Sequence, residues 1–133
     1  MIITIDGPAG AGKSSVARGL ARRLGFDYLD TGAMYRCVAL AGLRAQVDWN
    51  ALPLLAELAR RITIAFQGEQ VWLDGENVTS EIRSPEVTQL VYYAANNGAV
   101  REHLVGLQRS AAAGRDLVTE GRDQGTIAFP DAE

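Results

Sequence analysis

Ile2-Ile3-Thr4-Ile5-Asp6-Gly7-Pro8-Ala9-Gly10-Ala11-Gly12-Lys13-Ser14 is the stretch of this sequence that decides the fold. Its first four residues form a short, β-branched, apolar run, which is typical of a buried strand. Residues 7–14 match the pattern GxxxxGK[ST], and from Lys13 to Gly25 apolar residues recur at helical spacing, which predicts an amphipathic helix. The apolar stripe of that helix is expected to be Val16, Ala17, Leu20, Ala21 and Leu24. A glycine-rich loop between a strand and a helix is the setting in which this pattern binds phosphate.

The residue types of the loop each suit the binding of a nucleoside triphosphate. Glycines let the backbone curl so that successive N–H groups face an anion, and the start of the helix adds positive potential. We expect Lys13 to reach the β- and γ-phosphates as a catalytic residue, and the Ser14 hydroxyl to ligate Mg²⁺. The expected binding residues for Mg²⁺ and ATP are Gly7, Pro8, Ala9, Gly10, Ala11, Gly12, Lys13, Ser14 and Ser15. A chance turn rich in glycine and alanine is the alternative.

Composition narrows the class of protein further. A net charge of -3 and a pI near 5.2 give no bulk attraction to nucleic acid or to anionic lipid, so a phosphate ligand must be held by a few placed groups. Lys13 is the only lysine, whereas there are twelve arginines. Cys37 is the only cysteine, and no apolar run has the roughly 18 residues of a membrane span. We therefore expect a cytoplasmic protein without nucleic-acid or membrane partners.

The remainder of the chain alternates further strands and helices. The expected elements are a strand at 26–29, a helix from 30 to about 45, a helix within 48–61, an antiparallel patch from 62 with a turn at Asp74-Gly75, a helix from the Ser84-Pro85 cap to about 97, a helix to 114 and a buried strand at 117–119 followed by a turn at 120–123. This order predicts an α/β fold of three layers, with a parallel sheet, a right-handed crossover and a small antiparallel insert.

Two classes of nucleotide-binding protein are excluded. GTPases of this loop class carry an Asn-Lys-x-Asp base reader, which is impossible because Lys13 is the only lysine. Transporter ATPases carry a Ser-Gly-Gly-Gln signature, which the sequence lacks. The pattern therefore favours a small kinase that binds a second, phosphate-bearing substrate opposite the loop.

Arginines on the expected acceptor side suit that second phosphate. Arg36 lies in the first turns of the second helix, where its guanidinium, the Thr31 hydroxyl and exposed N–H groups would converge on an anion. Arg122 and Asp123 follow the third strand, at the edge where open α/β sheets bind ligands. The alternatives are a solvated helix arginine for Arg36 and a local ion pair for Arg122 with Asp123.

Four segments resemble the bacterial-type cytidylate kinases, which belong to the P-loop nucleoside monophosphate kinases. They are residues 5–13, residues 29–36 (Leu-Asp-Thr-Gly-Ala-Met-Tyr-Arg), residues 74–83 (Asp-Gly-Glu-Asn-Val-Thr-Ser-Glu-Ile-Arg) and residues 120–126 (Glu-Gly-Arg-Asp-Gln-Gly-Thr). The resemblance implies one kinase domain over 1–133, with 62–98 as a CMP-binding insert. It also implies that Thr31, Tyr35, Arg36 and Arg122 hold the CMP phosphate, and that Arg101 and Asp123 read the cytosine.

The chemistry of cytosine agrees with that implication. Cytosine presents an amino donor beside two acceptors, so a carboxylate and a guanidinium complement it, whereas uracil would place an oxygen against the carboxylate. We expect the γ-phosphoryl of ATP to pass in line to CMP or dCMP, giving ADP and CDP or dCDP, with Lys13 and Arg122 as the catalytic residues.

Two features depart from the family. Tyr92 and Tyr93 stand where the family often has a small hydroxyl residue near the base. The family also continues into further strands and an arginine-rich lid, so we expect this chain to be a truncated form that is inactive and prone to aggregate alone, and the complete enzyme to be a monomer. The alternatives are a non-catalytic nucleotide-binding fragment and a P-loop kinase for another small acceptor.

Overall fold

The computed structural model describes residues 1–6 and 13–121, which fall into two compact units. The first unit contains Met1–Gly32 and the chain from Val105 onward, and the second contains Ala33–Leu104. No helix within the described ranges is long and apolar enough to cross a membrane. The expected α/β fold, with a parallel sheet and a small antiparallel sheet, is confirmed.

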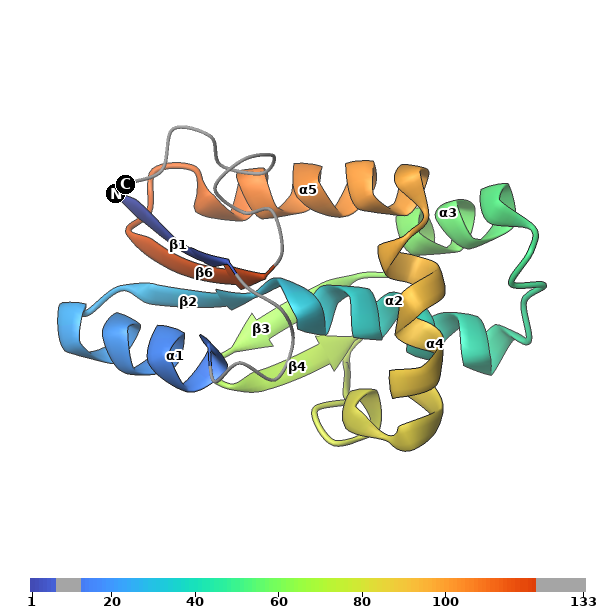
Figure 1. Cartoon of the computed structure of the whole chain (residues 1–133), viewed down its shortest axis with the longest axis horizontal. Helices are drawn as coiled ribbons and strands as arrows, with labels where there is room; N and C mark the ends of the chain where they lie inside the picture. Colours follow the sequence, from blue (N-terminus) through green and yellow to red (C-terminus); the bar gives the residue numbers. More distant parts are fainter. Residues whose placement is uncertain (7–12, 122–133) are drawn as a thin grey trace. The chain divides into compact units, whose positions relative to one another are not determined.

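A parallel sheet forms the centre of the first unit (Figure 1). Its strands are β1 (Ile2–Asp6), β6 (Leu117–Gly121) and β2 (Asp27–Asp30), in the order β1-β6-β2. Asp6 is the register partner of Gly121, and Asp30 is the partner of Glu120. The carboxyl ends of all three strands therefore lie at one edge of the sheet.

The parallel sheet differs from the sequence-based expectation at two strands. β6 continues through Glu120, which pairs with both β1 and β2, and through Gly121, which pairs with β1. The turn after this strand was therefore placed too early in the sequence-based expectation, at residue 120. Ile2 to Ile5 in β1 are half-buried rather than buried, because β1 lies at an edge of the three described strands. A strand at an edge has a neighbour on one side only, so it buries less apolar surface.

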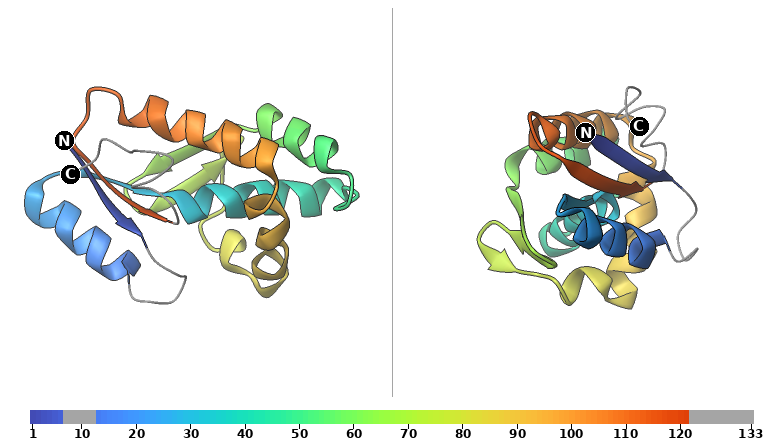
Figure 2. Two further views of the ribbon diagram at one scale, coloured as in Figure 1. Left: turned by 45° about the horizontal axis from the view of Figure 1, so that its top comes forward. Right: turned by 90° about the vertical axis from the view of Figure 1, so that its left-hand side faces the viewer.

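Helix α1 (Lys13–Leu24) packs against the parallel sheet, and Figure 2 shows it running alongside β1 and β6. Its contact face is centred on Ala17 and Ala21, which are buried against Val118. Val16 is 61% exposed, so the apolar stripe expected from the sequence is narrower in the structure. Ala17 and Ala21 are about one turn apart and share the buried face, whereas Val16 lies about 100° round the helix from Ala17 and is directed to solvent.

The second unit contains α2 (Thr31–Ala45) from Ala33 onward and α5 (Gly98–Ala112) as far as Leu104, together with several elements of its own. Its other elements are α3 (Leu52–Arg61), β3 (Ile64–Gln67), β4 (Gln70–Leu73), β5 (Glu76–Asn77), the 3₁₀ helix η1 (Glu81–Arg83) and α4 (Pro85–Ala95).

An antiparallel sheet in the order β3-β4-β5 packs against α2 in this unit. Asp74 and Gly75 connect β4 to β5, and both have positive φ values, 49° and 83°. A two-residue turn with two positive φ values twists in the same sense as the strands that it joins. Val71 and Leu73 point from β4 into the core, where Ile82 and Val87 complete a cluster with α2.

Asn97 caps α5 and also connects it to α3. The Asn97 Oδ1 accepts hydrogen bonds from the backbone N–H groups of Ala99 (3.1 Å) and Val100 (3.2 Å), and its Nδ2 donates to the Leu52 carbonyl (3.0 Å). The side chain is buried. We expect Asn97→Ala to lower the free energy of unfolding by about 1–2 kcal/mol, because the cap of α5 and the bond to the Leu52 carbonyl are both lost.

Urea unfolding of the variant and the parent measures this difference. Asn96→Ala is the matched control, because Asn96 is exposed and bonds only locally, to the Tyr92 carbonyl. Equal losses of stability for the two variants would show that the Asn97 side chain is not a structural tie.

Candidate active site

The strand ends of the first unit determine where the expected nucleotide site lies. β1 ends at Asp6, directly before the phosphate-loop pattern, and its register partner Gly121 directly precedes Arg122 and Asp123. The loop residues Gly7, Pro8, Ala9, Gly10, Ala11 and Gly12 and the pair Arg122 and Asp123 lie outside the described residues. Two segments that were predicted to bind phosphate thus start from neighbouring strand ends.

Helix α1 supplies the other border of the phosphate loop. It begins at Lys13, so Lys13, Ser14 and Ser15 form its first turn, and no acidic residue occurs in that turn. The first N–H groups of a helix have no partner within the helix and carry partial positive charge. This turn therefore has the electrostatic character that an incoming phosphate requires.

A buried polar network joins the ends of β2 and β6. The Thr31 Oγ1 donates to the Glu120 carbonyl oxygen (2.6 Å), and the Tyr28 hydroxyl donates to Glu120 Oε1 (2.9 Å). Thr31 is 2% exposed and Glu120 is 4% exposed. Burial, the charge of Asp30 and the bond to Glu120 raise the pKa of the Tyr28 phenol above its ordinary value.

This network constrains how Thr31 would meet a phosphate. A hydroxyl has one proton, and in the structure the Thr31 proton is directed at the Glu120 carbonyl. A phosphate oxygen accepts hydrogen bonds, so the hydroxyl has to turn away from Glu120 before it donates to such a ligand. The role of Thr31 in substrate binding stays a prediction.

The acceptor-side residues of α2 other than Thr31 lie in the second unit. Tyr35 and Arg36 are half-buried in the early turns of that helix. Arg36 Nη1 donates to the Ile82 carbonyl oxygen in η1 and to Thr88 Oγ1 in α4, at 2.9 Å in both cases. The alternative of a purely solvated helix arginine does not hold for Arg36, because its guanidinium is anchored to two other elements.

Arg101 and the aromatic pair of α4 complete the predicted base side of this unit. Arg101 lies in the first turn of α5, where its backbone N–H donates to the Asn97 carbonyl (2.9 Å). Tyr92 and Tyr93 are exposed, and the Tyr93 ring packs against Trp49 with the ring centroids 5.4 Å apart. Of the two residues expected to read cytosine, the structure describes Arg101, whereas Asp123 lies outside the described residues.

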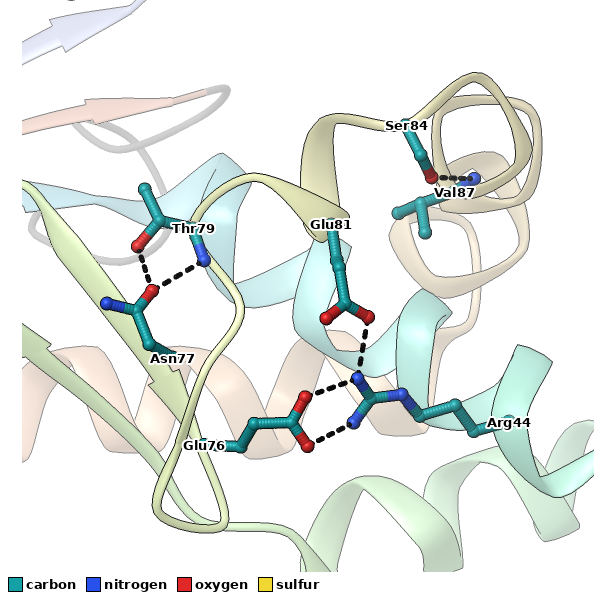
Figure 3. A network of polar contacts seen from close by, with 7 residues as sticks. All are labelled: Arg44, Glu76, Asn77, Thr79, Glu81, Ser84 and Val87. Carbon is teal, nitrogen blue, oxygen red and sulfur yellow. Dashed lines mark hydrogen bonds and ion pairs between the residues drawn. The ribbon is translucent and has the colours of Figure 1, made fainter.

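An arginine clamp connects α2 to the segment after β4 (Figure 3). The clamp consists of Arg44, Glu76 and Glu81. The guanidinium of Arg44 bonds both Glu76 oxygens at 3.2 and 2.8 Å and one Glu81 oxygen at 2.7 Å. These bonds raise the pKa of Arg44 above its ordinary value, Glu76 making the larger contribution. The pairs are solvent-exposed, so their main effect is geometric rather than energetic.

Sequence reasoning missed two residues that touch the predicted site. The sequence could have indicated that Glu120 has polar partners, because a carboxylate at the end of an otherwise apolar strand is costly to bury without them. The sequence contains no indication of the role of Thr88, since its bond to Arg36 joins residues 52 positions apart. Across residues 1–6 and 13–121, no three histidine, cysteine, aspartate or glutamate side chains gather as a metal site would require.

Comparison with known proteins gives the family. The family model described as "Cytidylate kinase" matches residues 3–133. Similar proteins named cytidylate kinase include those of Pelotomaculum thermopropionicum (54% identical over 136 residues, 98% of this chain and 60% of the relative) and Rhodopirellula baltica (50% over 132 residues, 99% and 58%). That of Mycobacterium leprae is 51% identical over 133 residues, 99% of this chain and 60% of the relative.

The chain spans about three fifths of the length of these relatives, and its match lies in their N-terminal part. The alignments with these relatives cover nearly all of the chain. This chain belongs to the cytidylate kinase family.

Proposed function

We propose that the protein carrying this chain is a cytoplasmic nucleoside monophosphate kinase that transfers the γ-phosphoryl of ATP to CMP or dCMP. The observation that carries this proposal is the common edge at the ends of β1 and β6, from which the phosphate loop and the Arg122-Asp123 pair both start, in a chain of this family. Donor and acceptor sites adjoin at such an edge in parallel α/β sheets.

Residues of this chain contribute binding and charge rather than a covalent intermediate. The loop amides and the first turn of α1 hold the ATP phosphates, while Arg36 and Arg122 hold the acceptor phosphate so that its oxygen meets the γ-phosphorus in line. Lys13 stabilises the charge that develops on the transferred group. The acceptor attacks through an anionic phosphate oxygen, so the reaction does not depend on a histidine base.

Mg²⁺ fits the donor set of this site as an ion shared with the nucleotide. The described residues hold no cluster of protein ligands, and in the sequence Ser14 directly follows Lys13, at which α1 begins. Mg²⁺ retains waters and substrate phosphates as ligands, so one protein hydroxyl suits it. When bound, it neutralises phosphate charge, and Ser14 would hold it.

Asp123→Asn tests the proposed base readout. An amide donates to uracil O4, which a carboxylate repels, so the variant should lose about 1–3 kcal/mol of discrimination between CMP and UMP. We expect the ratio of kcat/KM for CMP to that for UMP to fall about 5- to 150-fold. The measurement uses this chain and an extended protein, in which the Pelotomaculum relative supplies the residues that follow position 133.

Asp116→Asn is the matched control, because the exposed Asp116 pairs with the chain's amino terminus (2.9 Å) and has no predicted part in binding. A ratio that stays the same in Asp123→Asn would remove that residue from base recognition. An extended parent that transfers phosphate to shikimate or AMP in preference to CMP would favour the alternative of a different acceptor.

A further inference from the structure

Arg36 is held by two elements that are distant from it in the sequence. Both hydrogen bonds use Nη1, one to the Ile82 carbonyl oxygen and the other to Thr88 Oγ1. A guanidinium has five N–H groups in a rigid plane, so two bonds to one terminal nitrogen set the orientation of the whole plane.

Both acceptors of Arg36 are themselves fixed by the fold. Ile82 is fully buried, its N–H donates to the Val78 carbonyl (3.0 Å), and the adjacent Glu81 belongs to the arginine clamp of Figure 3. Thr88 lies in the first turns of α4, and its backbone N–H donates to the carbonyl of the capping residue Ser84 (2.9 Å). A β-branched threonine in a helix divides between two side-chain rotamers, so the Thr88 hydroxyl has few positions open to it.

We propose that Thr88 is a positioning residue, which orients the Arg36 guanidinium for the phosphate of the acceptor nucleotide. This inference rests on the proposed function, in which Arg36 binds that phosphate. Arginine loses much side-chain freedom when it binds a ligand, and anchoring it beforehand removes part of that cost from the binding step. The Thr88 hydroxyl gives the same nitrogen of Arg36 a second fixed acceptor beside the Ile82 carbonyl oxygen, and this second bond restricts rotation of the guanidinium plane.

Thr88→Val tests this role, because valine keeps the shape and the β-branch but cannot accept a hydrogen bond. We expect the Kd and KM for CMP to rise roughly tenfold, the size of one lost bond to a charged group, with kcat within about twofold. Thr88→Ser should retain the parent values. Thr63→Val is the matched control, because Thr63 is exposed in the same unit and its backbone, not its hydroxyl, bonds Asp74.

A double-mutant cycle with Arg36→Met separates positioning from a general effect on structure. If Thr88 acts through Arg36, then Thr88→Val should change CMP affinity in the parent and have no further effect when Arg36 is already methionine. The cycle is measured by calorimetric CMP binding and by steady-state kinetics in the extended protein, with urea unfolding of each variant.

The outcomes distinguish this inference from the function on which it rests. A parent that binds and phosphorylates CMP, together with a Thr88→Val variant that matches it, overturns the inference alone. An equal loss of affinity in both backgrounds of the cycle also overturns it. A parent that neither binds nor phosphorylates CMP overturns the proposed function, and the inference with it.

Discussion

Lys13→Ala is expected to reduce phosphoryl transfer to CMP by about a thousandfold or more, the scale on which a cationic group facing the transferred phosphoryl contributes. The ammonium group follows developing charge from the ground state into the transition state, so its loss should lower kcat more than it raises KM for ATP. Steady-state release of ADP by the extended protein, with CMP as acceptor, measures the effect.

Arg23→Ala is the matched control for this experiment. Arg23 is an exposed cation in the last turn of the same helix, far along the chain from the loop, and its removal should leave kcat within about twofold. Both variants should unfold at the urea concentration of the parent. Turnover of Lys13→Ala within threefold of the parent would show that Lys13 does not face the reacting phosphate.

Arg36→Met should raise the KM for CMP by about a hundredfold, because the acceptor phosphate would lose a charged, potentially bidentate partner. The KM for ATP should change little, since Arg36 is assigned to the acceptor alone. Initial rates with each substrate varied in turn separate these two effects. Methionine retains most of the aliphatic length of arginine without its charge or its hydrogen-bond donors, so the variant changes the apolar part of the side chain least.

Arg61→Met serves as the control for the loss of an arginine from the same unit. Arg61 is exposed and pairs with Glu57 one turn earlier in α3, a contact with little expected energetic value. If Arg36→Met raised the KM values for CMP and ATP equally, Arg36 would not be specific to the acceptor.

Helix caps and tight turns were the parts of the fold that the sequence predicted best. The Ser84-Pro85 pair was expected to start a helix, and Ser84 Oγ accepts from the Val87 N–H (3.3 Å) at the start of α4. The Asp74-Gly75 turn was expected from residue type alone, and both residues have the positive φ values that this turn needs. Caps and tight turns are determined by neighbouring residues, so one sequence contains their signal.

Features that depend on distant parts of the chain were predicted less well. The periodicity of α1 placed Val16 in the apolar stripe, yet the sheet approaches the helix over Ala17 and Ala21, and Val16 is exposed. The end of β6 was placed too early, because pairing with β1 and β2 extends this strand through the polar Glu120. Strand pairing adds ordering that the local residue types do not reveal.

In the candidate site, too, the sequence predicted the local features and missed the contacts between distant residues. The phosphate loop follows a spacing that a single sequence displays, and the structure confirms the strand and the helix on either side of it. The bonds from Thr31 to the Glu120 carbonyl and from Arg36 to Thr88 join residues 89 and 52 positions apart. Only the folded chain brings such partners together, and their effects on orientation and proton direction follow from it.

The acceptor panel tests the central claim most directly. The extended protein and this chain are each given ATP, Mg²⁺ and equal concentrations of CMP, dCMP, UMP, AMP and shikimate in one mixture, and the phosphorylated products are identified by mass and by ³¹P NMR. We predict that CDP and dCDP form first in the extended protein, and that Lys13→Ala abolishes both. Formation of ADP without CDP or dCDP, or of another phosphorylated acceptor ahead of them, would contradict the proposed CMP kinase activity.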